Sequence, residues 1–284
     1  MKTNVYVIYG GKSAEHEVSL ITGFSVINAL DKEKYNVYPV YISKEGHWCC
    51  LELQKSSIED VKHLQKHSST TVGSSMGRFL TEDFKEDEKS IIFPALHGTN
   101  GEDGTLQGFL ELLEVPYVGN TVLASAIGID KVVMKEIFSK YNIPQAKYIF
   151  FNYHHWANNP ENICCRTEEI IGYPCFVKPA KMGSSVGISR CHSPIELKKA
   201  IDEALLYDQK IIVEEEILGR EMQIAVIGND EPQCSVVGEY IQVKSFMDYE
   251  AKYVDGQLIP VIPAVLTPHT RKKCWRMQVK YLNY

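Results

Sequence analysis

The segment from Val177 to Ile188 is well suited to bind phosphate. It reads VKPAKMGSSVGI and contains Lys178, Ser184 and Ser185. Glycines let the backbone approach a ligand closely, exposed N–H groups and hydroxyls suit phosphate oxygens, and the lysines add positive charge. The segment is not a P-loop, because no helix opens here with G-K-[ST]. It predicts a strand, a phosphate-binding hairpin and a second strand, although a tight hairpin without a ligand stays open.

Carboxylates follow about 30 residues later in a strand-like run. Three consecutive acids begin at Glu214, and Glu221 comes shortly after them. Successive side chains on a strand alternate faces, so at least one of the three points inward. Carboxylates beside an adenine and a ribose can accept from the N6 amine and the hydroxyls. The alternative is a solvated acidic edge, and the upstream hairpin favours the nucleotide interpretation.

Glu15 lies where the first strand joins a helix, in the sequence GGKSAEHEVSL. This junction lacks the G-x-G-x-x-G fingerprint of dinucleotide sites. Ligands bind at the carboxyl ends of strands in open α/β sheets, and a carboxylate there could hold a substrate ammonium. The alternative is that Glu15 or Glu17 only complements the helix dipole.

Two further segments resemble parts of a binding site. The sequence HGTNGEDGTLQG, which starts at His97, is another junction between a strand and a helix, and its four glycines indicate a specially shaped backbone. Asp103 and Thr105 could simply cap that helix, while His97 points into the site. The polar and aromatic segment 244–253 reads KSFMDYEAKY and predicts an ordered loop that closes on a ligand.

The elements that position these residues follow an α/β pattern. Apolar strand-like runs at 5–9 and 37–42 flank a helical pattern at 19–30, which predicts a βαβ unit with a parallel sheet. Another strand follows at 91–95, and the first domain boundary lies near residues 115–120. Farther on, the sequence predicts helices at 105–113, 130–141 and 194–207, the last with a capping box at Ser193, and strands at 211–216, 221–227 and 235–243.

Composition limits the classes of protein to consider. The 284 residues are 44% hydrophobic and 23% charged, which is typical of an ordinary globular protein. A formal net charge of −6 argues against a nucleic-acid partner. No apolar run approaches the roughly 18 residues of a membrane span, and no export signal opens the chain, so we expect a cytoplasmic protein. None of the eight cysteines has C-x-x-C spacing, which favours reduced thiols over a zinc site.

Taken together, these motifs resemble the D-alanine–D-alanine ligase family over residues 4 to about 270. The resemblance implies a Rossmann-like N-terminal domain at 1–120. An incomplete ATP-grasp fold would follow, of mixed α/β and α+β character, with a central subdomain at 121–208 and a C-terminal subdomain at 209–284. It also implies D-alanine and ATP as substrates, Mg²⁺ or Mn²⁺ as the metal, and a homodimer. The product would be D-alanyl-D-alanine for peptidoglycan precursors.

The resemblance also implies a role for each site residue. Glu15 would bind the ammonium of the first D-alanine and form a hydrogen-bonded triad with Ser184 and Tyr253, which locks the loop over the substrates. His97 would line the first D-alanine site. The groups that hold the phosphates would be Lys131, Lys178, Ser185 and Lys252. Glu214 would accept from the adenine amine and Glu221 from the ribose.

The C-terminal end departs from the family pattern. The expected motifs with the metal ligands do not occur, so no metal-binding residue is assigned, and residues 271–284 do not fit the amphipathic helix expected there. If the codons for residues 274–284 are written out and one A is restored before the codon of Cys274, the shifted reading frame encodes residues with the apolar spacing of a helix. We therefore hypothesise a one-base deletion and expect an inactive or impaired ligase. Two alternatives are a noncatalytic remnant that binds D-alanine or nucleotide, and a related carboxylate–amine ligase with another acceptor.

Overall fold

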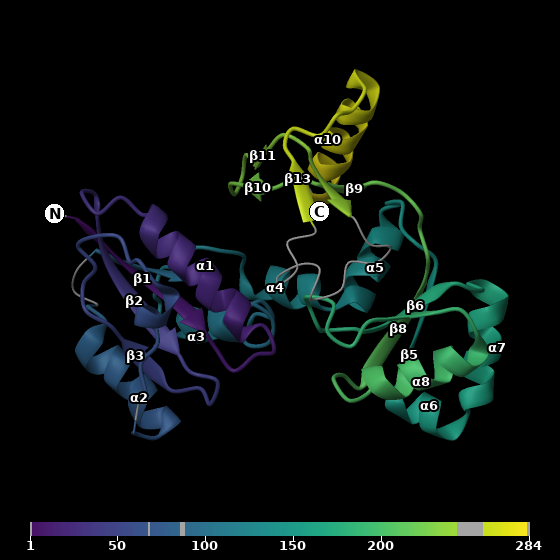
Figure 1. Ribbon diagram of the computed structural model, residues 1–284, viewed down its shortest axis with the longest axis horizontal. Helices are drawn as coiled ribbons and strands as arrows, with labels where there is room; N and C mark the ends of the chain where they lie inside the picture. Colours follow the sequence, from purple (N-terminus) through teal and green to yellow (C-terminus); the bar gives the residue numbers. More distant parts are fainter. Residues whose placement is uncertain (1, 68, 86–88, 243–257, 283–284) are drawn as a thin grey trace. The chain divides into compact units, whose positions relative to one another are not determined.

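The computed structural model describes residues 2–67, 69–85, 89–242 and 258–282, and these form two compact units (Figure 1). Unit 1 contains residues 1–134 together with 180–186, and unit 2 contains residues 135–179 and 187–284. The short segment 180–186, which holds the Gly/Ser loop, therefore packs with the N-terminal unit although the strands on either side belong to the other.

Unit 1 is built around a four-stranded sheet in the order β3-β2-β1-β4. Both β2 and β4 pair with β1 in parallel, and β3 is antiparallel to β2, so the predicted βαβ unit is confirmed. Its elements are β1 (Thr3–Gly10), α1 (His16–Ala29), β2 (Tyr35–Ile42), β3 (Trp48–Cys50), η1 (Val61–Leu64), α2 (Val72–Arg78), η2 (Phe79–Asp83), β4 (Ser90–Pro94), α3 (Thr105–Leu112) and α4 (Val122–Ile129).

Alternating side chains of β1 fill two separate cores. Tyr6 and Ile8 belong to the cluster on one face of the sheet, whereas Val5, Val7 and Tyr9 belong to the cluster on the other. Helix α1 packs closely on the second face, because a Cβ placed on Gly23 would lie 2.6 Å from the Tyr9 ring. Such two-sided burial is typical of a parallel sheet and fixes the carboxyl end of β1, where Glu15 follows.

Unit 2 contains a second four-stranded sheet, of antiparallel strands in the order β5-β8-β6-β7. Helix α5 (Lys131–Lys140) begins in unit 1 and continues into unit 2. The remaining elements are β5 (Tyr148–Asn152), α6 (Tyr153–Asn158), α7 (Pro160–Ile170), β6 (Cys175–Pro179), β7 (Ser189–Cys191), α8 (Pro194–Ala204), β8 (Lys210–Glu215), β9 (Glu221–Gln223), β10 (Val226–Ile227), β11 (Gln233–Cys234), β12 (Gly238–Gln242), β13 (Leu258–Val261) and α10 (Pro268–Leu282).

One face of this sheet is apolar, and the other carries charge. Phe151, Val177 and Val213 point into a core with α7 and α8, whereas Glu214 and Lys178 occupy the alternate positions. The predicted hairpin is confirmed, since β6 and β7 pair antiparallel across the Gly/Ser loop.

Helix α8 begins with only half of the predicted capping box. Ser193 Oγ accepts from Glu196 N at 3.3 Å, and Pro194 is the first helical residue. The carboxylate of Glu196, however, accepts from His192 N at 2.8 Å instead of from the backbone of Ser193.

The C-terminal part differs from the sequence predictions in two places. The expected strand at 221–227 is broken into β9 and β10, and the one expected at 235–243 is the shorter β12, which the two-residue β11 precedes. Residues 268–282 form helix α10, which the sequence predictions did not include. Thr267 explains where that helix starts, because its Oγ1 accepts from Thr270 N at 3.2 Å and Pro268 follows it. Among the described residues, no helix is both long and apolar enough to cross a membrane.

Candidate active site

A hydrogen bond joins the first strand–helix junction to the Gly/Ser loop. Ser184 Oγ donates to Glu15 Oε1, across 169 positions of sequence but within unit 1. Glu15 is only 4% exposed. Ser184 and Ser185 both have left-handed backbones, with φ of +46° and +63°, which is uncommon for residues with a side chain. The loop is thus held in a specific shape with one hydroxyl on the buried carboxylate.

Two glycines make room for the Glu15 carboxylate. A Cβ on Gly183 would lie 2.9 Å from Glu15 Oε2. A Cβ on Gly98 would lie 2.7 Å from Ser13 Oγ and closer still to Glu15 Oε2, and its φ of +69° also favours glycine. Three segments that are distant in sequence therefore enclose one carboxylate.

The charge of Glu15 has no protein counter-ion in the part of the chain that the structure describes. No lysine, arginine or histidine there forms an ion pair with it. Glu15 is the N-cap residue of α1, but its side chain makes no capping hydrogen bond, and Glu17 is bound instead to Lys44 at 2.7 Å. Because a buried carboxylate without a cationic partner is costly, this geometry suits a cationic ligand better than a helix cap.

His97 lies in a polar environment on the same unit. One ring nitrogen is 2.8 Å from Thr22 Oγ1, and the other is 3.5 Å from Glu102 Oε1. The hydrogen bond with Glu102 raises the pKa of His97, against the effect of burial. Its ring lines a pocket of about 480 Å³. Asp103 Oδ1 accepts from the backbone N of Thr105, the first residue of α3, at 3.0 Å, although the N-cap residue of that helix is Gly104.

Lys131 supports the Gly/Ser loop in the structure. Its Nζ donates to the backbone oxygens of Ala180 and Met182, at 3.4 and 2.5 Å, and its own N–H donates to Ala180 at 3.0 Å. Ser185 lies in the same loop. The role of both residues in holding phosphate stays a prediction.

Unit 2 contains a second buried carboxylate with different partners. Glu214 is 7% exposed and forms ion pairs with Lys178 through Oε2 and with Lys135 through Oε1, the latter at 2.8 Å. Burial alone would raise the pKa of Glu214, but the two ammonium groups outweigh it and hold that pKa below its ordinary value. The inward acid that the strand pattern predicted is thus Glu214.

The other predicted residues are placed as follows. Glu221 opens β9 and lies opposite Tyr240 of β12, apart from the β8 sheet that carries Glu214. Tyr253 and Lys252 lie outside the described residues, so the third member of the expected triad and the fourth phosphate-binding group stay predictions.

Sequence reasoning missed Lys135. It is 8% exposed and pairs with a carboxylate that the sequence had assigned to adenine. A signal was available, because Lys131 and Lys135 are four residues apart on one helix and such residues share a face.

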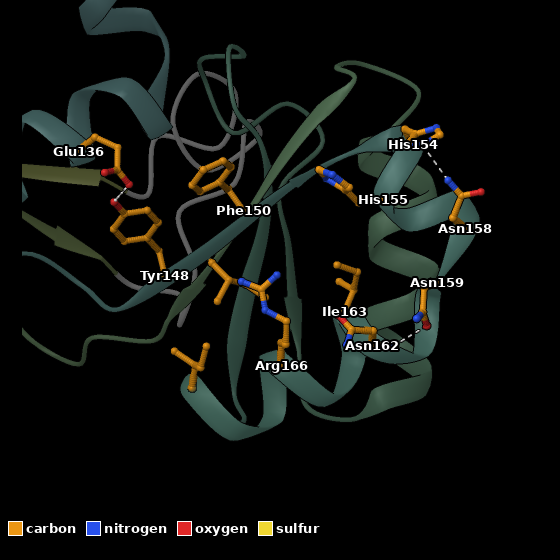
Figure 2. Close-up of a pocket in the computed structure, with 12 residues that line it drawn as sticks. Glu136, Tyr148, Phe150, His154, His155, Asn158, Asn159, Asn162, Ile163 and Arg166 are labelled. Carbon is orange, nitrogen blue, oxygen red and sulfur yellow. Dashed lines mark hydrogen bonds between the residues drawn. The ribbon is translucent and has the colours of Figure 1, made fainter.

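The described residues offer little for a metal ion. They contain no group of three or more His, Cys, Asp or Glu side chains arranged to hold one. A larger pocket of about 760 Å³ runs along β5 and α7, with Phe150 and Arg166 among its lining residues (Figure 2). None of the predicted site residues lines this pocket.

Comparison with known proteins identifies the family. Residues 4–120 match the family model of the D-ala D-ala ligase N-terminus, and residues 137–283 match that of the C-terminus. A D-alanine–D-alanine ligase from Geobacillus kaustophilus is 53% identical over 94% of this chain and 74% of its own length. Another, from Bacillus licheniformis, is 49% identical over 99% and 79%.

Solved structures agree with this assignment. The VanG D-Ala:D-Ser ligase from Enterococcus faecalis matches with a TM-score of 0.77 and 29% identity, over 100% of this chain and 82% of that one. The D-alanine–D-alanine ligase from Coxiella burnetii matches with a TM-score of 0.74 and 27% identity, over 99% and 77%. These neighbours confirm the ATP-grasp fold class expected from the sequence. The chain belongs to the D-alanine–D-alanine ligase family.

Proposed function

We propose that this chain carries the site that joins two D-alanines at the expense of ATP, giving D-alanyl-D-alanine for peptidoglycan precursors. The observation that supports this function best is the hydrogen bond from Ser184 to Glu15. It joins two of the three residues of the expected triad, in which Glu15 binds the first D-alanine and Ser184 helps to lock the loop. The carboxylate is buried and has no cationic partner among the described side chains, which suits a substrate ammonium.

The reaction would proceed in two steps. A carboxylate oxygen of the first D-alanine attacks the γ-phosphorus of ATP, and ADP leaves with the electron pair of the broken P–O bond. The amine of the second D-alanine then attacks the carbonyl carbon of the acyl phosphate, loses a proton and expels inorganic phosphate. Lysine ammonium groups stabilise the charge on the transferring phosphoryl group. In this proposal these are Lys131, Lys178 and Lys252, with Ser185 as a hydroxyl donor.

Substrate positions follow from the same assignments. Glu15 would fix the first D-alanine by its ammonium, and His97 would line the pocket beside it. Glu214 would accept from the adenine amine, Glu221 from the ribose, and Tyr253 would complete the hydrogen bonds to the loop. Mg²⁺ or Mn²⁺, when bound, would help to offset the negative charge of the phosphates in such a ligase. The described residues do not by themselves form a site that fits either ion.

Phosphate release and D-alanine binding test the proposal separately. With ATP, magnesium and D-alanine, phosphate release marks ligation, and calorimetry measures D-alanine binding. We expect Glu15→Gln to weaken D-alanine binding by about 10- to 100-fold, the value of one charge-assisted hydrogen bond. Glu17→Gln is the matched control, since Glu17 is an exposed acid two residues away that pairs with Lys44.

The outcomes distinguish the functions. Phosphate release that depends on D-alanine supports the ligase, and binding without release supports the noncatalytic alternative and the predicted loss of activity. If both variants bind D-alanine as tightly as the unaltered chain, Glu15 is not the ammonium site and the proposal fails.

A different acceptor is a second candidate, and the similarity to a D-Ala:D-Ser ligase favours testing it. D-alanine, D-serine and D-lactate would compete as acceptors while the first substrate is held at saturation. We expect D-alanine to win, and predominant use of D-serine would assign the chain to the other acceptor class. A homodimer and a cytoplasmic location complete the proposal, and light scattering of the purified chain tests the first.

A further inference from the structure

Glu214 is held by two lysines that differ in their surroundings. Lys135 Nζ lies 2.8 Å from Oε1, and the side chains of both partners are 9% exposed. Lys178 pairs with Oε2, but its side chain is 23% exposed. Lys135 is therefore enclosed together with the carboxylate, whereas Lys178 is more accessible to solvent.

The positions of the two lysines in the chain differ as well. Lys178 is the penultimate residue of β6, and the Gly/Ser loop begins directly after that strand. Lys135 lies in the middle of α5, where its ammonium also stands 5.2 Å from the centre of the Tyr148 ring. Tyr148 is directly opposite Glu214 in the β5–β8 pairing, so Lys135 has two fixed contacts on one row of the sheet.

A bound triphosphate would compete with Glu214 for the ammonium group of Lys178. In the proposed function Lys178 holds ATP phosphates, yet in the structure it pairs with Glu214. A triphosphate carries several negative charges and is a stronger partner for an ammonium group than one carboxylate. If Lys178 moves to the phosphates, Glu214 keeps only the cation that remains beside it.

We propose that Lys135 is the permanent counter-ion and positioning residue of Glu214, and that Lys178 is an exchangeable partner that passes from Glu214 to the triphosphate. This inference rests on the proposed function. It adds a residue that keeps Glu214 ionised and oriented after Lys178 has left. An ionised carboxylate only accepts hydrogen bonds, so it favours the N6 amine of adenine over the O6 acceptor of hypoxanthine.

The first test removes the permanent partner. In Lys135→Met, ATP binding would leave Glu214 buried without a cation, and the carboxyl would take up a proton. Calorimetry at pH 7 in two buffers of different ionisation enthalpy counts protons bound per ATP. We expect Lys135→Met to take up on the order of one proton more than the unaltered chain. Its preference for ATP over ITP should fall by about tenfold or more.

Three variants serve as controls for Lys135→Met. Lys135→Arg should restore the proton count and the ATP preference. Lys198→Met removes an exposed lysine that pairs with Glu161 at 2.6 Å in the same unit, and it should change neither quantity. In the double variant Lys135→Met/Glu214→Gln the extra proton should disappear, because the group that takes it up is gone.

Lys178→Met gives a second route that does not depend on the folding of Lys135→Met. It should weaken ATP and ITP binding by the same factor and leave their ratio unchanged, since Lys135 still holds Glu214. If the ratio of ATP to ITP affinity falls in Lys178→Met but not in Lys135→Met, the two lysines have the reverse roles and the inference is overturned.

The failures of the two proposals are distinguishable. If the unaltered chain binds no ATP, the proposed function is wrong and the inference falls with it. If ATP binds and Lys135→Met changes neither the proton count nor the ATP preference, only the inference is wrong, even when that variant melts at a lower temperature.

Discussion

The two buried carboxylates of this protein, Glu15 in unit 1 and Glu214 in unit 2, are satisfied in opposite ways. They are almost equally buried, at 4% and 7% exposed. Glu214 forms ion pairs with two ammonium groups, those of Lys135 and Lys178. Glu15 accepts a hydrogen bond from the Ser184 hydroxyl, and no described cationic side chain pairs with it. The two carboxylates are therefore similarly buried, but the described protein supplies cations to only one of them.

This difference separates a charge that the protein itself compensates from a charge that is left for the cation of a ligand. Moving a carboxylate out of water costs several kcal/mol unless cations and hydrogen bonds offset the loss. For Glu214 the protein supplies the cations, so the charge contributes to the stability of unit 2. For Glu15 the described protein supplies only neutral donors, which leaves the cation to the substrate. Substitutions that remove charge at the two sites should thus differ in stability and binding.

The largest expected effect is at Glu214. Glu214→Gln removes the negative charge but leaves two buried ammonium groups facing a neutral amide, and we expect it to lower the free energy of unfolding by about 3 kcal/mol. Urea unfolding followed by circular dichroism measures the change. Glu161→Gln, which breaks an exposed ion pair with Lys198, is the control and should leave the midpoint nearly unchanged.

Acid provides an independent check on Glu214. Its pKa is lowered in the folded chain, so its contribution to stability is present above the unfolded value of 4.5 and is lost as pH falls through the folded value. The stability difference between the native chain and Glu214→Gln should therefore persist at neutral pH and shrink only below about pH 4.5. A difference that shrank near pH 6 instead would mean that Glu214 is not held by cations.

The second largest effect is expected where the backbone makes room for Glu15. Gly98→Ala would place a methyl group against Glu15 and Ser13 at a left-handed φ of +69°. We expect it to lower the free energy of unfolding by about 2 kcal/mol and to weaken D-alanine binding as well. In Gly77→Ala the new methyl group meets no atom within 4 Å and lies in a helix, so this control should stabilise the chain by about 0.5–1 kcal/mol. Equal losses in both variants would show that the space beside Glu15 is not special.

Local signals in the sequence predicted much of the fold. The β1–α1–β2 unit, the β6–β7 hairpin and the Pro194 start of α8 each depend on residues close together in the chain. Strand alternation also predicted that at least one of the three acids beginning at Glu214 points inward. Helix α10 was missed, because its start depends on the cap at Thr267 and not on apolar spacing.

Contacts between distant segments were not available from local patterns. The pairing of Glu15 with Ser184 came from the family resemblance, since no periodicity connects residues 169 positions apart. Lys135 lies four residues after Lys131 on α5, but only the tertiary structure shows the carboxylate with which it is buried. Ion pairs of this kind depend on how a helix packs on a sheet, which one-dimensional patterns do not determine.

A smaller effect is expected at His97, which senses the charge of Glu15. The pKa of His97 is raised mainly by its hydrogen bond with Glu102, with a minor contribution from the charge of Glu15. The stability that His97 contributes is therefore fully present below the unfolded pKa of 6.5 and is lost as pH rises through the folded value. NMR titration should show a lower pKa for His97 in Glu15→Gln and a larger decrease in Glu102→Gln. The opposite order would mean that Glu15 is the closer partner of the ring.

The smallest stability change is expected at Glu15 itself, and this prediction distinguishes the two carboxylates most sharply. In Glu15→Gln the amide oxygen can still accept from Ser184, while a buried charge that lacks a described counter-ion is removed. We therefore expect the free energy of unfolding to change by less than about 1 kcal/mol, although D-alanine binding is weakened. Urea unfolding and calorimetry on the same preparation measure both quantities. A stability loss as large as that of Glu214→Gln would mean that the fold depends on the charge of Glu15, and that this charge is not held in reserve for a substrate ammonium.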